Sequence, residues 1–304
     1  MAFLPEADIR IDEALVSRIL RTGAPSLAHH TPVASGEGFD AVIYRIGPEH
    51  AIRLPRRAYA SGIIETEQRW LPLLSEGVDT ATPVALIAGQ ASADFPRPWS
   101  IVPWIEGETV ASVPPASRDH LAAPLAHFVG SFQRAAPASA PENSYRGGPL
   151  AHRDHSVRER LASGRIAQAD QLLEIWEQAL RAPQWTGLSL WLHGDLHPNN
   201  LICRTAEDGE MDLAGVIDFG DLTAGDPATD VATAWLTLEP AAREEFFNGF
   251  EPCYDVDGPL LERAQGWALL MASAMITEAG DNPVLTAVAE HTFSQLLSEE
   301  RGLF

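Results

Sequence analysis

The feature that most constrains this chain is a pair of polar motifs set in short apolar sequence. The first, "WLHGDLHPNN", spans residues 191–200, and the second, "VIDFGD", spans residues 216–221. The apolar runs around them are strand-like, so we expect residues 188–219 to form a compact hairpin region that holds both motifs. The polar residues could bind a metal ion, carry out acid–base chemistry or cap a turn.

The order of residue types in the two motifs is typical of phosphoryl transfer. Asp195 and Asn200 lie in one loop, and Asp218 follows a second apolar run. Mg²⁺ takes oxygen ligands and usually few of them from the protein. Asn200 and Asp218 can supply such ligands, which leaves Asp195 to accept a proton from an acceptor hydroxyl.

The histidines of the first motif suggest an alternative, a zinc site. His193 and His197 could be two of its ligands, but no third Cys or His lies at a supporting spacing. We expect His193 to orient the loop through hydrogen bonds, and the sequence leaves the role of His197 open. The two cysteines, Cys203 and Cys253, are expected to be free thiols.

The sequence before the motifs predicts a small β-rich lobe over residues 1–105. A helix over residues 12–23 is expected to be capped by Asp12 and to end at Gly23. Next comes "SGEGFD", which we interpret as a glycine-bearing loop. Further strands and one further helix are indicated by the runs "AVIYRIG", "AIRLP", "ASGIIETEQRWLPLL", "PVALIAG" and "PWSIVPWI".

After a hinge at about residues 103–107, the pattern becomes mostly helical. A larger lobe over residues 108–304 is therefore expected, with the hairpin region in its middle. In its first helical run, Pro124 predicts a kink or a late helix start. The predicted fold class is α+β, with two lobes.

Charge and composition exclude several partners. The formal net charge is −21, and all 21 basic residues are arginine. An acidic surface repels phosphate backbones, so we expect no nucleic-acid partner, whereas a cationic small molecule is compatible with it. The N-terminus does not resemble a signal peptide and no apolar run is long enough to cross a membrane. We expect a cytoplasmic protein, acting as a monomer.

Taken together, "WLHGDLHPNNLI" and "GVIDFGDLTAGDPATDVA" resemble the aminoglycoside phosphotransferase family, which includes macrolide phosphotransferases and is akin to choline kinases. The similarity runs from about Ser35 to Trp235 and more loosely to the C-terminus. It implies a protein-kinase-like fold with Asp195 as the catalytic base and Asn200 and Asp218 as Mg²⁺ ligands. Asp230 resembles a family position that supports the catalytic loop.

The resemblance also implies a nucleotide site for GTP or ATP. The residues implied are Ser35, Gly36, Gly38, Arg53, Glu67, Val102, Pro103 and Ile105. Arg53 stands where many relatives have a phosphate-pairing lysine. Its ion-pair partner is expected to be Glu67, with Glu65 as the alternative. The Pro103 carbonyl and the Ile105 N–H would face the base.

The acceptor is the least determined part of the sequence. Trp267, Met271 and Met275 recur at helical spacing and form either plain core or an apolar wall for a bulky substrate, while Glu278 and Asp281 could pair with an amine. The resemblance favours a macrolide antibiotic, followed by an aminoglycoside and then a choline-like or sugar-like metabolite. From another class, the arginine at position 53 permits a nucleotide-binding pseudoenzyme that acts as a sensor.

Overall fold

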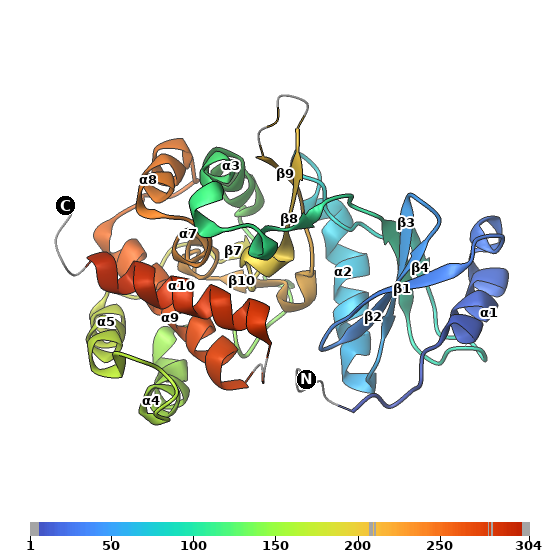
Figure 1. The fold of residues 1–304 in the computed structure, drawn as a ribbon, viewed down its shortest axis with the longest axis horizontal. Helices are drawn as coiled ribbons and strands as arrows, with labels where there is room; N and C mark the ends of the chain where they lie inside the picture. The colour runs from blue at the N-terminus through green and yellow to red at the C-terminus, as the bar shows by residue number, and fades with distance from the viewer. Residues whose placement is uncertain (1–5, 207–208, 210, 279, 281, 300–304) are drawn as a thin grey trace. The chain divides into compact units, whose positions relative to one another are not determined.

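A computed structural model describes residues 6–206, 209, 211–278, 280 and 282–299 (Figure 1). The described chain divides into two compact units, each with its own core. One comprises residues 6–77 and 81–106, and the other comprises residues 78–80 and the described residues from 107 onward. The main boundary between them lies between Glu106 and Gly107.

The N-terminal unit is built on a five-stranded antiparallel sheet with a helix on each face. The strand order is β1 (Pro32–Glu37), β2 (Ala41–Ile46), β3 (His50–Pro55), β5 (Trp99–Pro103) and β4 (Ile87–Gly89). The two helices are α1 (Glu13–Gly23) and α2 (Ser61–Leu74). Alternate residues of each strand point to opposite faces of the sheet, so two residues that are adjacent in the sequence face different helices.

The first helix covers one face of this sheet as its sequence pattern requires. The predicted cap is present, since the Asp12 carboxylate accepts a hydrogen bond from the backbone N–H of Leu15. The apolar stripe of α1 packs with Ile46 and Ile52 in one core. Arg53, next in sequence to Ile52, therefore points to the other face, where α2 lies.

The interpretation of "SGEGFD" as a loop was wrong for its first half. Ser35, Gly36 and Glu37 belong to β1, which pairs with β2 through a bulge between Ala34 and Gly36. Only the residues from Gly38 to Asp40 form the turn. The strand lies at the sheet edge with five of its six residues exposed, so no buried alternation marks it in the sequence.

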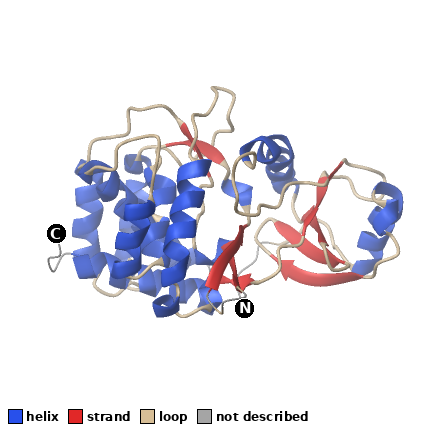
Figure 2. Cartoon of the chain, turned by 90° about the horizontal axis from the view of Figure 1, so that it is seen from above, coloured by secondary structure: helices blue, strands red, loops and turns tan. Residues whose placement is uncertain are grey.

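The C-terminal unit is mostly helical, as Figure 2 shows, which confirms the predicted α+β class. Its helices are α3 (Ala122–Phe132), α4 (Asp154–Ala162), α5 (Ala169–Arg181), α6 (Ala228–Val231), α7 (Thr233–Thr237), α8 (Pro240–Gly249), α9 (Gly258–Glu278) and α10 (Pro283–Glu299). Its strands are β6 (Glu108–Thr109), β7 (Leu190–Leu192), β8 (Leu201–Thr205), β9 (Met211–Val216) and β10 (Thr223–Gly225). Strands β6, β8 and β9 form one sheet, and β7 pairs with β10.

The helices of this unit surround α9, which packs against α5, α6 and α10. Pro124 lies in the first turn of α3, because a 3₁₀ turn precedes the helix and delays its start. Within the described part of the chain, no helix combines the length and the apolar character that a membrane crossing requires.

Candidate active site

The pairing of β7 with β10 brings the two sequence motifs together. Leu192, the last residue of β7, lies opposite Thr223, the first residue of β10. The loop that follows β7 therefore runs beside the end of the second motif. Gly194 adopts a φ of +87°, and a Cβ there would lie 2.4 Å from the carbonyl oxygen of Asp221. Only glycine allows this close approach.

A buried aspartate holds the start of this loop. Asp230 accepts hydrogen bonds from the backbone N–H groups of His193 (2.7 Å) and Gly194 (2.9 Å). Burial raises the pKa of Asp230, and the neighbouring His193 and the two N–H donors oppose that shift. The Asp230 carboxylate thus satisfies two backbone N–H groups of the loop that have no partner in a β-sheet.

The His193 side chain is fully buried, and each of its two ring nitrogens makes a hydrogen bond. Its Nδ1 accepts a hydrogen bond from the backbone N–H of Asp195 (3.2 Å), and its Nε2 lies 2.9 Å from the carbonyl oxygen of Ile217. The carbonyl can only accept, so the geometry assigns the proton of the ring to Nε2. His193 ties the first motif to the strand end that precedes Asp218.

The Asp195 carboxylate is held on both of its oxygens. Arg146 donates from Nη2 to Oδ1 at 2.8 Å, and Nε2 of His197 lies 3.3 Å from Oδ2. Withdrawal from water would raise the pKa of Asp195, but the charges of His197 and Arg146 lower it well below the ordinary aspartate value. Asp195 is therefore ionised at neutral pH.

Arg146 joins Asp195 to a second carboxylate. The same Nη2 lies 3.1 Å from Oδ2 of Asp221, whose Oδ1 accepts a hydrogen bond from Nδ2 of Asn143 (2.8 Å). Loss of hydration raises the pKa of Asp221, with Arg146 acting against the shift and Asp195 adding to it. The Arg146 Nε is closed off from solvent and has no hydrogen-bond partner among the described residues. An orphaned buried N–H costs about 1–3 kcal/mol.

Arg146 lies in the stretch "APASAPENSYRGGP", residues 136–149, which has the composition of a loop, so the sequence did not indicate it as a site residue. The structure fixes this segment along β10. Thr223 donates from its hydroxyl to the Pro141 carbonyl (2.9 Å), and the Asp226 N–H donates to the Gly147 carbonyl (2.8 Å). The segment has no apolar periodicity, so no local signal marks it as part of the site.

Asn200 and Asp218, the two expected Mg²⁺ ligands, are brought together by the backbone. The Ile217 N–H donates to the Asn200 carbonyl at 2.9 Å, directly before Asp218. Asn200 Nδ2 donates to the Asp195 carbonyl (2.9 Å), so its side-chain oxygen points away from that loop. Asp218 adopts a left-handed backbone with φ of +62°. Such a conformation is uncommon outside glycine and often marks a functional position.

These two side chains fit Mg²⁺, because both offer oxygen and the metal needs few protein ligands when phosphates supply the others. Over the described ranges, no group of three or more His, Cys, Asp or Glu is arranged to hold a metal ion. The zinc alternative with His193 and His197 finds no third ligand there. Instead, both histidines hold the loop and the Asp195 carboxylate.

In the N-terminal unit, Arg53 and Glu67 form a buried ion pair. Arg53 Nη1 lies 2.6 Å from Glu67 Oε2, with the two side chains 9% and 5% exposed. Glu65 is exposed on the other side of the same helix. The structure therefore selects Glu67 over Glu65 as the partner of Arg53.

The remaining residues of the predicted nucleotide site lie at the ends of this sheet. Ser35 and Gly36 lie in the edge strand β1, and Gly38 closes the following turn by donating its N–H to the Ala41 carbonyl (2.9 Å). Val102 and Pro103 are the last two residues of β5, and Ile105 follows that strand.

The structure contradicts an apolar acceptor wall on α9. Trp267 and Met271 are 1% and 2% exposed, and Met275 is buried as well. They face the neighbouring helices because α9 is the central helix of this unit, so they form core. Glu278 pairs with Arg160 at 2.6 Å. Asp281 lies outside the described residues.

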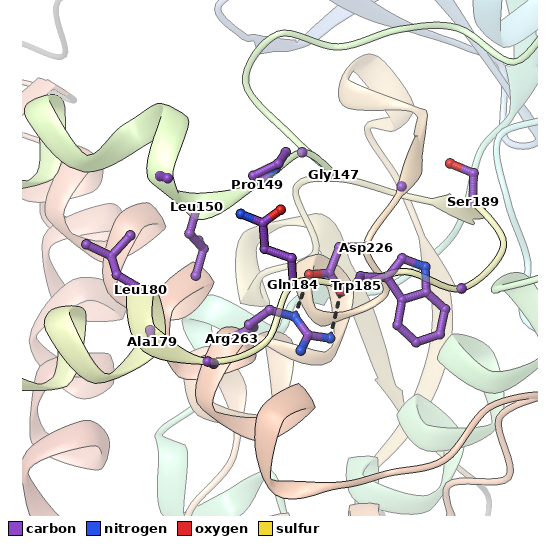
Figure 3. A pocket seen from close by; sticks show the side chains of 15 residues that line it. Gly147, Pro149, Leu150, Ala179, Leu180, Gln184, Trp185, Ser189, Asp226 and Arg263 are labelled. Carbon is purple, nitrogen blue, oxygen red and sulfur yellow. Dashed lines mark hydrogen bonds and ion pairs between the residues drawn. The ribbon is translucent and has the colours of Figure 1, made fainter.

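The C-terminal unit contains a cavity of about 230 Å³ that the sequence did not indicate (Figure 3). A buried ion pair lies on its wall, with Arg263 Nε 2.7 Å from Asp226 Oδ2. Leu150 and Leu180 supply apolar lining, and Gly147 joins the cavity to the segment that carries Arg146. None of the predicted site residues lines it.

Comparison with known proteins places this geometry in a family. A model of the phosphotransferase enzyme family matches residues 29–267, which is most of the chain. The chain belongs to this family. It is thus a phosphotransferase, and the family resemblance drawn from the two motifs is confirmed. A search of curated proteins found no match.

Solved structures of family members share the fold. An aminoglycoside 2′-phosphotransferase-IIIa in complex with GDP is 18% identical, with a TM-score of 0.71 over 95% of this chain and 100% of that chain. A macrolide 2′-phosphotransferase from Brachybacterium faecium is 19% identical, with a TM-score of 0.60 over 96% and 99%. The macrolide 2′-phosphotransferase type I gives the same identity and TM-score over 93% and 98%. These similarities confirm the kinase-like fold of the phosphotransferase.

Proposed function

We propose that this phosphotransferase moves the γ-phosphoryl group of GTP or ATP to a hydroxyl group of a small-molecule antibiotic, and that the acceptor is a macrolide. The observation that carries the proposal is the arrangement around Asp195. An ionised carboxylate, fixed by Arg146 and His197, lies in one loop with Asn200 and one hydrogen bond away from the Asp218 strand end.

The reaction follows from the role of Asp195 as base. Its carboxylate accepts the proton of the acceptor hydroxyl while the hydroxyl oxygen bonds to the γ-phosphorus. The bond from the γ-phosphorus to the bridging oxygen breaks, and the nucleoside diphosphate leaves with that electron pair. Little further covalent chemistry is required, so positioning and charge supply most of the rate enhancement.

Asn200 and Asp218 would hold Mg²⁺ in this proposal. When bound, the metal neutralises phosphate charge and orients the phosphates. The protein supplies the oxygen donors from two backbone segments that are fixed to one another by the hydrogen bond from Ile217 to Asn200. A fixed ligand pair reduces the reorganisation that metal binding requires.

On the nucleotide side, Arg53 takes the place of the family's lysine. The guanidinium retains the positive charge, and the ion pair with Glu67 fixes its direction. The turn at Gly38 would cover phosphates, and the end of β5 from Val102 to Ile105 would offer backbone groups to the base. Backbone contacts of this kind do not readily separate GTP from ATP, so both donors enter the test.

The charge around the site supports a macrolide over a polycation. Asp195 and Asp221, the two carboxylates that meet at the site, both already pair with Arg146. An aminoglycoside carries several ammonium groups and is bound best by carboxylates without such partners. A macrolide with a single amine needs fewer such carboxylates.

An aminoglycoside is the second candidate acceptor. The observation in its favour is that the aminoglycoside phosphotransferase in complex with GDP superimposes with a higher TM-score than either macrolide enzyme, 0.71 against 0.60. The fold supports both classes, so only the reaction itself separates them.

The test is an acceptor panel read by mass spectrometry. The purified chain is incubated with Mg²⁺, GTP or ATP, and one acceptor at a time from a set that includes erythromycin, kanamycin and choline. We expect the mass of one phosphate to be added to the macrolide. Phosphorylation of kanamycin alone would support the second candidate. Nucleotide binding without transfer to any acceptor would contradict the proposal and favour the pseudoenzyme.

A further inference from the structure

We propose that Arg146 is a positioning residue of the transfer reaction: through Oδ1 it holds the Asp195 carboxylate in the orientation that accepts the proton of the acceptor hydroxyl. The inference rests on the proposed function. Arg146 lies 49 residues before Asp195 and belongs to neither sequence motif.

One nitrogen of Arg146 bridges two carboxylates. Arg146 Nη2 lies 2.8 Å from Asp195 Oδ1 and 3.1 Å from Asp221 Oδ2. Asp221 is itself held by Asn143, through Nδ2 at 2.8 Å from Oδ1. The carboxylate of Asp195 therefore cannot rotate freely, because its partner is fixed by a second anchored group.

The segment that carries Arg146 is itself held in place. Hydrogen bonds to Pro141 and Gly147 hold the segment at both ends, and Gly147 has a φ of +74°. A Cβ at Gly225 would lie 2.1 Å from the Gly147 carbonyl oxygen, so the two backbones are in direct contact. A charged group on such support keeps its position when a substrate binds.

The consequence concerns the path of the proton. With the carboxylate held by Arg146 at Oδ1 and by His197 at Oδ2, the O–H bond of the acceptor breaks and its proton binds to the Asp195 carboxylate. The acceptor oxygen bonds to the γ-phosphorus, and the nucleoside diphosphate leaves with the electrons of the broken bridging bond. Arg146 makes no bond to a reacting atom, which is why its role is positioning.

The experiment compares Arg146→Ala, Arg146→Lys and Arg158→Ala in the full-length protein. Arg158 is the matched control, since it pairs with Asp154 and Glu177 at the surface, 41% exposed. The kcat and KM are measured with GTP or ATP and the acceptor found by the panel, and nucleotide hydrolysis is measured without acceptor. Each variant is then titrated with guanidinium chloride at low millimolar concentration, with equal NaCl as a control for salt.

We expect Arg146→Ala to lower kcat about 10²-fold with little change in the KM for nucleotide, the scale of loss for a misplaced catalytic group. Guanidinium should restore kcat saturably by occupying the space between the two carboxylates, and NaCl should not. Arg146→Lys keeps a charged nitrogen but on a shorter side chain, which does not reach both carboxylates from the same backbone position, so its kcat should also fall. Arg158→Ala should match the wild type.

The contrary outcomes are distinct. If the wild type transfers phosphate and Arg146→Ala keeps its kcat, the inference is wrong and the function stands. If kcat falls and guanidinium restores nothing, Arg146 acts only in folding, which also overturns the inference. Should Arg146→Ala fail to fold, a wild-type kcat in Arg146→Lys overturns it. If the wild type neither transfers nor hydrolyses nucleotide, the proposed function fails, and the inference with it.

Discussion

Arginine carries all 21 Lys-or-Arg charges in this chain, and several buried or half-buried arginines hold carboxylates. Arg53 holds Glu67, Arg263 holds Asp226, and Arg146 holds Asp195. The guanidinium stays charged when buried and offers several donors in a plane, whereas a buried lysine can lose its proton. At the scale of single residues, the Asp195 carboxylate is thus fixed by a partner that remains charged over the physiological pH range.

The ion pair between Arg53 and Glu67 gives a prediction about stability and nucleotide binding. Replacing Glu67 with Ala leaves the Arg53 charge buried without this partner, so we expect the free energy of unfolding to fall by about 3–5 kcal/mol. The KM for nucleotide should rise, because Arg53 loses its orientation. Urea unfolding and steady-state kinetics measure both effects.

Glu65 provides the matched control, since it lies on the same helix and is exposed. The variant Glu65→Ala should stay within about 0.5 kcal/mol of the wild type. Equal effects of the two substitutions would mean that the buried pair has no special role.

At the scale of elements, the segment that carries Arg146 lies against β10 through a backbone contact that only glycine permits. Gly225→Ala would place a Cβ 2.1 Å from the Gly147 carbonyl oxygen, so β10 and the segment that carries Arg146 must separate. We expect a loss of about 1–3 kcal/mol in the free energy of unfolding, the usual range for overpacking. We also expect a lower kcat, because Arg146 shifts relative to Asp195.

Gly62→Ala in α2 is the control, as a Cβ there meets no atom within 4 Å. Removing a helical glycine should leave stability unchanged or raise it by up to about 1 kcal/mol. Thermal unfolding and kcat, measured on both variants, decide the matter. A Gly225→Ala enzyme with wild-type kcat would show that the segment does not position Arg146.

Elements with a strong apolar period could be predicted from the sequence, and the others could not. The apolar stripe of α1 and its Asp12 cap predicted that helix. The order and spacing of the two motifs predicted that Asp195, Asn200 and Asp218 belong to one site. Helix α4 was missed because only Val157 and Leu161 of its residues are buried.

The parts of the site that the sequence did not predict depend on tertiary contacts. Arg146 lies in a segment without periodicity, and its partners are distant in sequence. For Trp267 and Met271, helical spacing was consistent with either core or a substrate wall. The structure shows that both side chains are buried in the core. Their burial results from the packing of α5, α6 and α10 around α9, which no local sequence pattern encodes.

At the scale of the whole molecule, His291 links folding stability to pH. Burial lowers its pKa to about 4, with the charges of Arg118 and Arg243 adding to the shift. An unfolded histidine has a pKa of about 6.5. Between these values the unfolded state binds a proton that the folded state does not, so stability falls as the pH drops from about 6.5 towards 4.

His291→Leu removes this proton uptake. Going from pH 7 to pH 5, the wild type should lose about 2 kcal/mol more of its free energy of unfolding than the variant does, a difference that urea titrations at both pH values can measure. An identical pH dependence for both proteins would contradict the assignment. The carboxylates are the same in the wild type and in His291→Leu, so the difference between their pH dependences reports on His291 alone.

The central claim is that Asp195 promotes the transfer of a γ-phosphoryl group to a hydroxyl. The most direct measurement is a single-turnover assay with nucleotide labelled at the γ-phosphate, comparing the wild type with Asp195→Asn. Asp79→Asn, at a side chain 90% exposed, is the control. We predict that Asp195→Asn loses about 10²–10⁴-fold in transfer rate while it still binds nucleotide, and that the control transfers like the wild type. Transfer by Asp195→Asn at the wild-type rate would contradict the account.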